Sequence, residues 1–268
     1  MIIIGEKING TRKSVAKAIR DRDVTFIEEL AKSQTDAGSS YLDVNAGTAP
    51  EREPEDMRWL IEVIQEVSEL PLCLDSANPH ALKAGLESVN KLPLVNSLSA
   101  EKKRIEGILP LLDDFDFELI LLALDDNGIP ATSEGRLVII RTLVDLVKSK
   151  GLLEEKLFVD PLVTAISTGT ENAKLTFETI KQIKDEYPLC HVTGGLSNIS
   201  FGMPLRPLIN RYFMSMAIQM GLDSAIINPN DRELREAMMA GELLMGHDRH
   251  CMTFNRSFRA GKIGPQTN

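Results

Sequence analysis

The chain has few cysteines and no long apolar run, and each absence excludes a class of protein. Its three cysteines, Cys73, Cys190 and Cys251, cannot build a disulfide framework, so we expect a reducing, cytoplasmic compartment. The longest apolar runs, such as 119–124, are far shorter than the roughly 20 residues of a membrane-spanning helix, so we expect no membrane partner. Residues 1–6 lack the basic segment and the long apolar core of a signal peptide.

The chain also lacks an excess of positive charge. Its formal net charge is −9, and acidic and basic residues are interspersed. Nucleic acids are attracted to basic surfaces, so we expect no nucleic acid partner. Apolar residues, in contrast, are plentiful: 43% of the chain is hydrophobic, which is enough for one sizeable core in a single domain.

Short runs of β type alternate with longer segments of helical periodicity. The predicted strands cover residues 2–4, 41–45, 72–75, 94–96, 119–124, 157–161, 190–192 and 225–229. The predicted helices cover residues 24–37, 57–67, 137–147 and 233–244. A further helix is expected to begin at Asn78-Pro79, because a capping Asn followed by Pro is typical of a helix start.

This alternation predicts an α/β protein, a (β/α)8 TIM barrel that forms a single domain over residues 1–246. A doubly wound open sheet is the alternative. Residues 5–10 lack the Gly-x-Gly-x-x-Gly turn that usually follows the first strand of such a sheet. Residues 247–268 are expected to form a C-terminal tail, packed on the barrel or at a dimer contact.

Acids and amides follow nearly every predicted strand. They are Glu6, Asn9, Asp43, Asn45, Asp75, Asn96, Asp160, Ser197, Asn198 and Asn228. The carboxyl ends of the strands form the active face of such a barrel, so we expect these side chains to converge on one mouth. Buried polar groups need partners, and we expect some of them to pair with each other or with water.

The stretch 189–200 places two glycines at the end of the seventh predicted strand. Gly194 and Gly195 permit backbone angles closed to other residues and a close approach of a ligand to the main chain. The Asn198 amide beside this turn can both donate and accept hydrogen bonds. The alternative interpretation is a strand-to-helix turn in which Ser197 or Asn198 caps a helix.

The composition of the mouth limits its ligand. Its only nearby cations are Lys7 and Arg206, which makes phosphate a poor match. A flat heterocycle with an amidine-like donor edge fits best, because a carboxylate accepts two parallel hydrogen bonds from such an edge.

Carboxylates also suit hard cations, but the pattern does not favour a metal site. His191 is expected to be packed inside its strand. The closely spaced His247, His250 and Cys251 are more typical of a solvated tail than of metal ligands.

Six short motifs at the strand ends resemble the pterin-binding methyltransferases. They are Gly-Glu-Lys-Ile-Asn at 5–9, Leu-Asp-Val-Asn at 42–45, Leu-Asp-Ser at 74–76, Val-Asn-Ser at 95–97, Val-Asp-Pro at 159–161 and Gly-Leu-Ser-Asn-Ile-Ser at 195–200. This family includes the methyltetrahydrofolate:corrinoid protein methyltransferases and the folate domain of cobalamin-dependent methionine synthase. The resemblance runs in order from residue 1 to about 246. The sequence departs from the family pattern at two positions. Lys7 stands where the family commonly has arginine, and Phe201 is more typical of methionine synthase than of the acetogen-type enzymes.

The resemblance implies a (β/α)8 barrel with a pterin in its mouth. The residues at matching positions that would hold the pterin are Asp75, Asn96, Asp160, Gly195, Ser197, Asn198 and Arg206. Supporting roles would fall to Glu6, Asp43 and Asn45. Asn198 would be the catalytic residue, because it would reach the folate nitrogen that carries the methyl group. The implied substrate is tetrahydrofolate or methyltetrahydrofolate, the cobalt would arrive on a separate corrinoid protein, and the domain would bind no metal of its own.

The implied activity is methyl transfer between tetrahydrofolate and the cobalt of a corrinoid protein. We favour transfer from a methylcorrinoid protein to tetrahydrofolate in the demethylation of methoxylated aromatics or glycine betaine. The alternatives are acetogen-type transfer to a corrinoid iron–sulfur protein, a dihydropteroate synthase, a non-catalytic folate-binding subunit and a metal-dependent lyase. A synthase would need basic residues for pyrophosphate, and the seventh strand ends without a lysine. Related enzymes are homodimers, so we expect a homodimer.

Overall fold

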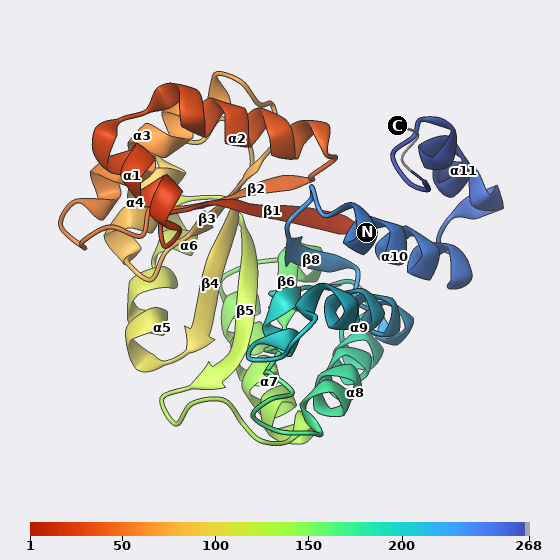
Figure 1. Ribbon diagram of the computed structural model, residues 1–268. Helices are drawn as coiled ribbons and strands as arrows, with labels where there is room; N and C mark the ends of the chain where they lie inside the picture. The colour runs from red at the N-terminus through yellow and green to blue at the C-terminus, as the bar shows by residue number, and fades with distance from the viewer. Residues whose placement is uncertain (266–268) are drawn as a thin grey trace.

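The computed structural model describes residues 1–265, which form eight parallel strands with helices around them (Figure 1). The strands are β1 (Ile2–Asn9), β2 (Tyr41–Asn45), β3 (Leu72–Asp75), β4 (Leu94–Ala100), β5 (Glu118–Asp125), β6 (Leu157–Asp160), β7 (His191–Val192) and β8 (Ser224–Ile227). They pair in the order β7-β6-β5-β4-β3-β2-β1-β8. The predicted (β/α)8 barrel is therefore confirmed.

The barrel closes between β7 and β8 without a regular ladder. The Ile226 N–H donates to the Gly194 carbonyl at 3.0 Å, and Gly195 pairs with Ile226 as an isolated parallel bridge. Below them, the hydroxyls of Thr193 and Ser224 are 3.1 Å apart. The two glycines thus end β7 after two residues, and their backbone completes the barrel wall.

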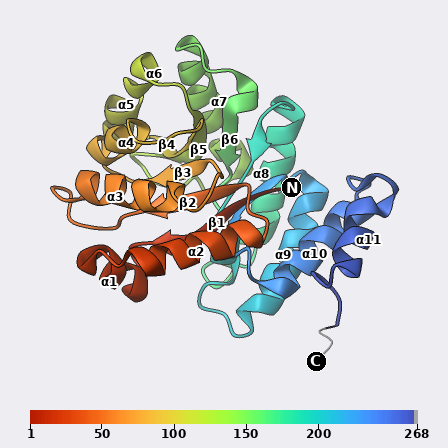
Figure 2. The ribbon, with the colours of Figure 1, turned by 90° about the horizontal axis from the view of Figure 1, so that it is seen from above.

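Helices form a ring outside the sheet (Figure 2). Within residues 1–265 they are α1 (Lys13–Asp21), α2 (Val24–Asp36), α3 (Glu53–Gln65), α4 (Pro79–Leu86), α5 (Lys102–Ile108), α6 (Leu111–Asp114), α7 (Ser133–Ser149), α8 (Asn172–Glu186), α9 (Arg206–Met220), α10 (Arg232–Leu244) and α11 (Met252–Arg259). The predicted start at Asn78-Pro79 is confirmed, because the Asn78 side chain accepts from the His80 N–H at the start of α4. No helix among these residues combines the length and apolar character needed to cross a bilayer.

The core has two parts. Most buried apolar side chains lie between the sheet and the helices. A smaller cluster of five fully buried residues fills the inside of the barrel, and its members are Ile4, Cys73, Leu94, Ile120 and Phe158. Side chains two residues apart on a strand point to the same face. The next inward layer toward the carboxyl ends therefore consists of Glu6, Asp75, Asn96, Leu122 and Asp160.

The C-terminal tail packs on α10. Ile263 is buried, and Arg232 of α10 donates to the carbonyls of Gly261 and Gly264. The helix α11 follows η3 (Arg249–Cys251) and contacts α10 alongside. The last part of the predicted tail, 266–268, lies outside the described residues.

Candidate functional site

A cavity of about 250 Å³ opens at the carboxyl ends of the strands. Five of the predicted strand-end residues line it: Glu6, Asn9, Asp43, Asp75 and Asn96. Its remaining lining residues, which the sequence did not indicate, are Thr11, Arg12 and Ile226. The ends of β1 to β4 thus meet at this cavity.

The register of the sheet brings the acids and amides together. Asp75 on β3 pairs with Asn96 on β4, and Asn9 on β1 pairs with Asn45 on β2. The Asn45 amide donates to Asp75 Oδ2 at 2.9 Å. Neighbouring strands therefore hold these side chains at one level, directly above the apolar cluster inside the barrel.

Asp43 and Asp75 form a pair of carboxyl groups in the wall of the cavity. Burial and the neighbouring charge of Asp75 raise the pKa of Asp43 well above its usual range, against hydrogen bonds from Cys73 and Asn96. Burial also raises the pKa of Asp75, but the Asn45 amide and the Arg104 charge oppose the rise. Burial thus disfavours the charged form of both carboxyl groups, and the negative charge of Asp75 adds to this effect at Asp43.

Two acceptor atoms in this wall have no partner within residues 1–265. They are Asp43 Oδ1 and Asn45 Oδ1, and both are buried. A buried acceptor without a donor is costly, because it has lost its hydrogen bonds to water. Asp43 is one of the residues that line the cavity, so a ligand that presents a hydrogen-bond donor there would satisfy Asp43 Oδ1.

Asp160 occupies the end of β6 and is only 8% exposed. Burial raises its pKa to about 7, even though the Leu162 N–H donates to Oδ1 at 2.7 Å and the Arg136 charge favours ionisation. Arg136 comes from α7, is buried, and donates to the carbonyls of Pro161 and Leu162 at 2.7 and 2.8 Å. Asp160 therefore changes its charge near neutral pH.

The turn after β7 lies against Asp160. A side chain at Gly194 would place its Cβ 3.2 Å from Asp160 Oδ1, and one at Gly195 would place it 3.0 Å from Asn198 Nδ2. Both glycines therefore leave room for the polar groups of the mouth. Asn198 lies in η2 (Leu196–Ser200), and its side chain is exposed. Its backbone N–H donates to the Gly195 carbonyl within this 3₁₀ turn, and no side chain caps the turn, so the alternative in which Asn198 caps a helix does not apply.

Arg206 fixes the position of this turn. Its guanidinium donates to the Ser197 carbonyl at 2.9 Å and to the Ser200 hydroxyl at 3.1 Å, and it lies 5.6 Å from the Phe201 ring. Its charge also lowers the pKa of Glu6, which burial raises more strongly. Arg206 thus connects the β7 turn to the β1 side of the mouth.

The predicted site residues therefore form two adjoining groups. The first lies on β1 to β4 and consists of Glu6, Asp43, Asn45, Asp75 and Asn96. The second lies at β6 and the β7 turn and consists of Asp160, Gly195, Ser197, Asn198 and Arg206. They meet at Ile226, which lines the cavity and bridges to Gly195. Asn228 does not line the cavity; its side chain accepts from the Asn230 N–H instead.

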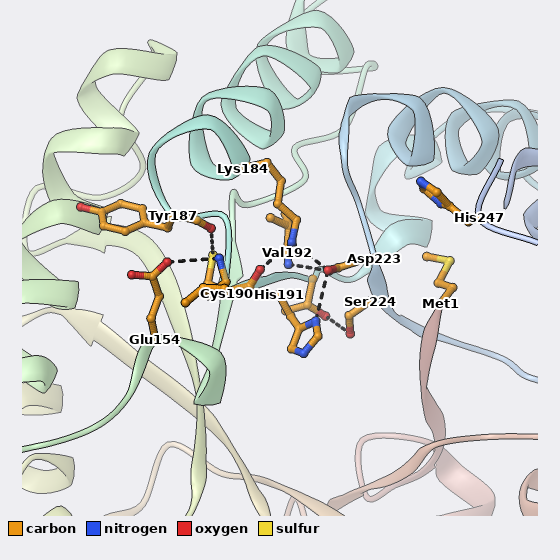
Figure 3. Close-up of polar contacts among 12 residues, drawn as sticks. Met1, Glu154, Lys184, Tyr187, Cys190, His191, Val192, Asp223, Ser224 and His247 are labelled. Atoms are coloured by element: carbon orange, nitrogen blue, oxygen red, sulfur yellow. Dashed lines mark hydrogen bonds and ion pairs between the residues drawn. The ribbon is translucent and has the colours of Figure 1, made fainter. Parts of the chain in front are cut away.

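His191 is the first residue of β7 and lies beside Asp223 (Figure 3). Its Nδ1 is 3.1 Å from Asp223 Oδ2, which also accepts from Lys184 at 2.8 Å. Asp223 Oδ1 accepts from the Val192 N–H at 2.8 Å. Burial raises the pKa of Asp223, but these hydrogen bonds outweigh it and hold the pKa below its usual value. This cluster fastens β7 to the start of β8 at the amino end of the barrel.

Three comparisons with known proteins agree with this geometry. The model of the pterin binding enzyme family matches residues 5–228. The chain is 43% identical over 267 residues to a methylcorrinoid:tetrahydrofolate methyltransferase from Eubacterium limosum, and the match covers 99% of this chain and 98% of that protein.

A second relative is a methionine synthase from Mycobacterium tuberculosis, 30% identical over 241 residues. The match covers 85% of this chain and only 20% of the synthase, so the chain corresponds to about a fifth of that protein. Among solved structures, a dihydropteroate synthase from Xanthomonas albilineans in complex with 7,8-dihydropteroate aligns with a TM-score of 0.67 and 16% identity, covering 91% of this chain and 92% of that one. At this identity the likeness shows the shared barrel fold alone.

Proposed function

Because the chain belongs to the pterin binding enzyme family, we propose that it is a methyltransferase that moves a methyl group between tetrahydrofolate and the cobalt of a corrinoid protein. The observation that carries this proposal is the cavity with buried, unpartnered acceptors at the carboxyl ends of the strands. The methylcorrinoid:tetrahydrofolate methyltransferase that is 43% identical over nearly its whole length supports it.

The chemistry of a pterin matches the two groups of site residues. Its amidine-like edge donates parallel hydrogen bonds, which a carboxylate accepts with both oxygens. Asp75 and Asp160 would supply these carboxylates, and the Asn96 amide would bind the remaining ring atoms. Gly195 and Ser197 would line the ring, while Arg206 would hold their turn in place. Glu6, Asp43 and Asn45 would support the first group.

Asn198 would act on the folate nitrogen that carries the methyl group. In the proposed direction, this nitrogen uses its lone pair to attack the methyl carbon, the cobalt–carbon electron pair stays on cobalt, and the nitrogen loses its proton. Asn198 Oδ1 would accept a hydrogen bond from the N–H and so orient the lone pair. In the reverse direction, Nδ2 would donate to the nitrogen as the methyl leaves, and solvent or a carboxylate would supply the proton.

The name of the relative that is 43% identical supports a corrinoid protein as the partner and tetrahydrofolate as the methyl acceptor. A corrinoid protein would present its methyl group at the open mouth, where Asn198 is exposed. Methyl groups would pass onto tetrahydrofolate, as in a demethylation pathway for methoxylated aromatics or glycine betaine. The free cysteines Cys73, Cys190 and Cys251 support a reducing, cytoplasmic compartment.

We also propose a homodimer that forms through α9. Leu208, Tyr212 and Met216 recur every four residues on this helix and are 42%, 68% and 50% exposed. They border an apolar groove of about 440 Å³ between α8 and α9. A continuous apolar stripe of this kind is typical of an interface. In the dimer, the same stripe of a second copy would pack against this one. Tyr212→Glu should prevent this contact, so light scattering of the variant should give half the mass of the wild-type protein.

The test of the proposed activity is an assay of the purified protein with tetrahydrofolate and methylcobalamin, in which methyltetrahydrofolate is measured. Methyl transfer at a rate well above the uncatalysed background is the expected result. If the protein bound folate but transferred no methyl group to or from any corrinoid, it would be a non-catalytic folate-binding subunit. Release of pyrophosphate from a pterin pyrophosphate and p-aminobenzoate would identify a synthase instead.

A further inference from the structure

The cavity is too small to enclose a whole tetrahydrofolate, and this inference rests on the proposed function. Its volume of about 250 Å³ falls below the roughly 300–1,000 Å³ of pockets that enclose a drug-sized ligand. A bicyclic ring fits, whereas the aminobenzoyl group and the glutamate must lie outside. The glutamate carries two carboxylates, which the acidic walls of the cavity repel. The tail therefore needs an exit beside positive charge.

Most cationic side chains around the mouth already donate hydrogen bonds to backbone carbonyls. Arg104 donates to the carbonyls of Ser76 and Ser97, and Arg136 and Arg206 are held in the same way on β6 and the β7 turn. The side chains of Lys7 and Arg12, in contrast, make neither a hydrogen bond nor an ion pair within residues 1–265. These two cations are therefore free to meet a ligand.

The position of these two cations suits an anionic tail. Arg12 lines the cavity and stands immediately before α1, whose first turn has no acidic residue and no side-chain cap. The unsatisfied N–H groups of that turn and the helix dipole favour negative charge at the same place. Lys7 lies on β1, where burial and then repulsion from Arg12 lower its pKa. An anion between the two side chains would relieve that repulsion.

The order of the strands connects the position of Lys7 and Arg12 to the folate nitrogen that reacts. The tail of folate is attached at the carbon next to the nitrogen that Asn198 would contact. The β7 turn bridges to β8 through Gly195 and Ile226, and Ile226 in turn pairs with Ile4 on β1. A tail that leaves the reacting end of the pterin therefore passes over β8 and reaches Lys7 and Arg12.

We propose that Lys7 and Arg12 form a carboxylate-binding subsite for the glutamate tail of the folate substrate. Each further glutamate of a polyglutamate tail adds a carboxylate near these cations and strengthens binding. The subsite contributes to affinity and leaves the reacting atoms untouched, so its loss raises KM and preserves kcat.

The test compares Lys7→Gln/Arg12→Gln with the matched control Lys17→Gln/Arg20→Gln, which removes two charges from exposed positions on α1. Dissociation constants are measured for tetrahydrofolate and for 6-methyltetrahydropterin, which lacks the tail. An exposed charge pair changes an affinity by up to about fivefold, so the test variant should bind tetrahydrofolate about two- to fivefold more weakly. Binding of the tetrahydropterin should weaken less than binding of tetrahydrofolate in the test variant, and it should not change in the control.

The salt dependence provides a second measurement on the wild-type protein. Tetrahydrofolate triglutamate should bind more tightly than the monoglutamate, and the difference should shrink at high ionic strength, because salt screens exposed charges. An unchanged ratio of tetrahydrofolate to tetrahydropterin affinity in Lys7→Gln/Arg12→Gln would overturn the subsite. If the wild-type protein bound the tetrahydropterin but gained nothing from the tail, the subsite alone would be wrong. If it bound neither molecule, the proposed function would fail with it.

Discussion

Asp160→Asn should make the protein more stable at neutral pH while it weakens folate binding. Burial raises the pKa of Asp160 from 3.8 to about 7, so ionising this carboxyl group costs the folded state free energy that the unfolded chain does not lose. A raised pKa of this kind gives stability that is present below pH 3.8 and is lost as the pH rises through about 7. Asn keeps the acceptor for the Leu162 N–H and never ionises.

The magnitude follows from the pKa difference. About three pH units at about 1.4 kcal/mol each give roughly 4 kcal/mol as an upper value above pH 7. At about 2 °C per kcal/mol for a chain of this size, the variant should melt roughly 8 °C higher at pH 8 and at the same temperature near pH 4. Urea unfolding at several pH values measures the same difference as a free energy.

The control is Asp145→Asn, which removes an exposed carboxylate from α7 and should show no such trend with pH. The binding measurement depends on the ionised form of Asp160, because a carboxyl group accepts both pterin hydrogen bonds only when it is charged. Folate affinity of the wild-type protein should therefore fall up to about tenfold per pH unit below pH 7, and Asp160→Asn should bind weakly at all pH values. Equal stability of wild type and Asp160→Asn at both pH 4 and pH 8 would refute the reasoning.

Three further substitutions test other parts of the molecule. Asn198→Ala should lower the rate of methyl transfer by about 10²–10⁴ while folate affinity, measured by titration, changes little; transfer at the native rate would remove Asn198 from the mechanism. Asp75→Ala should weaken folate binding by about 10–100-fold because a charged acceptor is lost. At saturating folate, this variant should still transfer methyl groups rapidly. Asp223→Ala should lower the free energy of unfolding by about 2–3 kcal/mol, since Lys184, His191 and a backbone N–H lose their acceptor, and unchanged folate affinity would confirm that this cluster acts only on the barrel seam.

The strand ends could be read from the sequence because the rule behind them is local. Cys73 and Asp75, or Leu94 and Asn96, are two residues apart and must share a face of their strands. Once the strands are parallel and closed, that period alone places an apolar layer inside the barrel and a polar layer above it. The family and the barrel are confirmed, and four of the five residues of the first group line one cavity.

Several elements were missed because their patterns are blurred by packing. In α8, Thr176 and Thr179 are fully buried and face the core, so a count of apolar residues understates its buried side. In α9, Tyr212 and Met216 are apolar yet exposed, so its two faces look alike in sequence. The first strand continues to Asn9, well past the predicted 2–4, because a bulge after Gly5 resumes pairing with β2.

The sequence by itself determined that Glu6, Asp75 and Asn96 stand at the mouth, since alternation along a strand is fixed by backbone geometry over a few residues. Only the tertiary structure decided the pKa values and the hydrogen-bond partners of these side chains. Arg136 comes from α7, the α-helix that precedes β6, and donates to the Pro161 carbonyl next to Asp160. Burial at the barrel end raises the pKa of the Asp160 carboxyl to about 7. Likewise, the closure of β7 on β8 depends on backbone contacts made around Gly194 and Ile226. Such properties arise from long-range contacts and desolvation, which exist only once the whole barrel has formed.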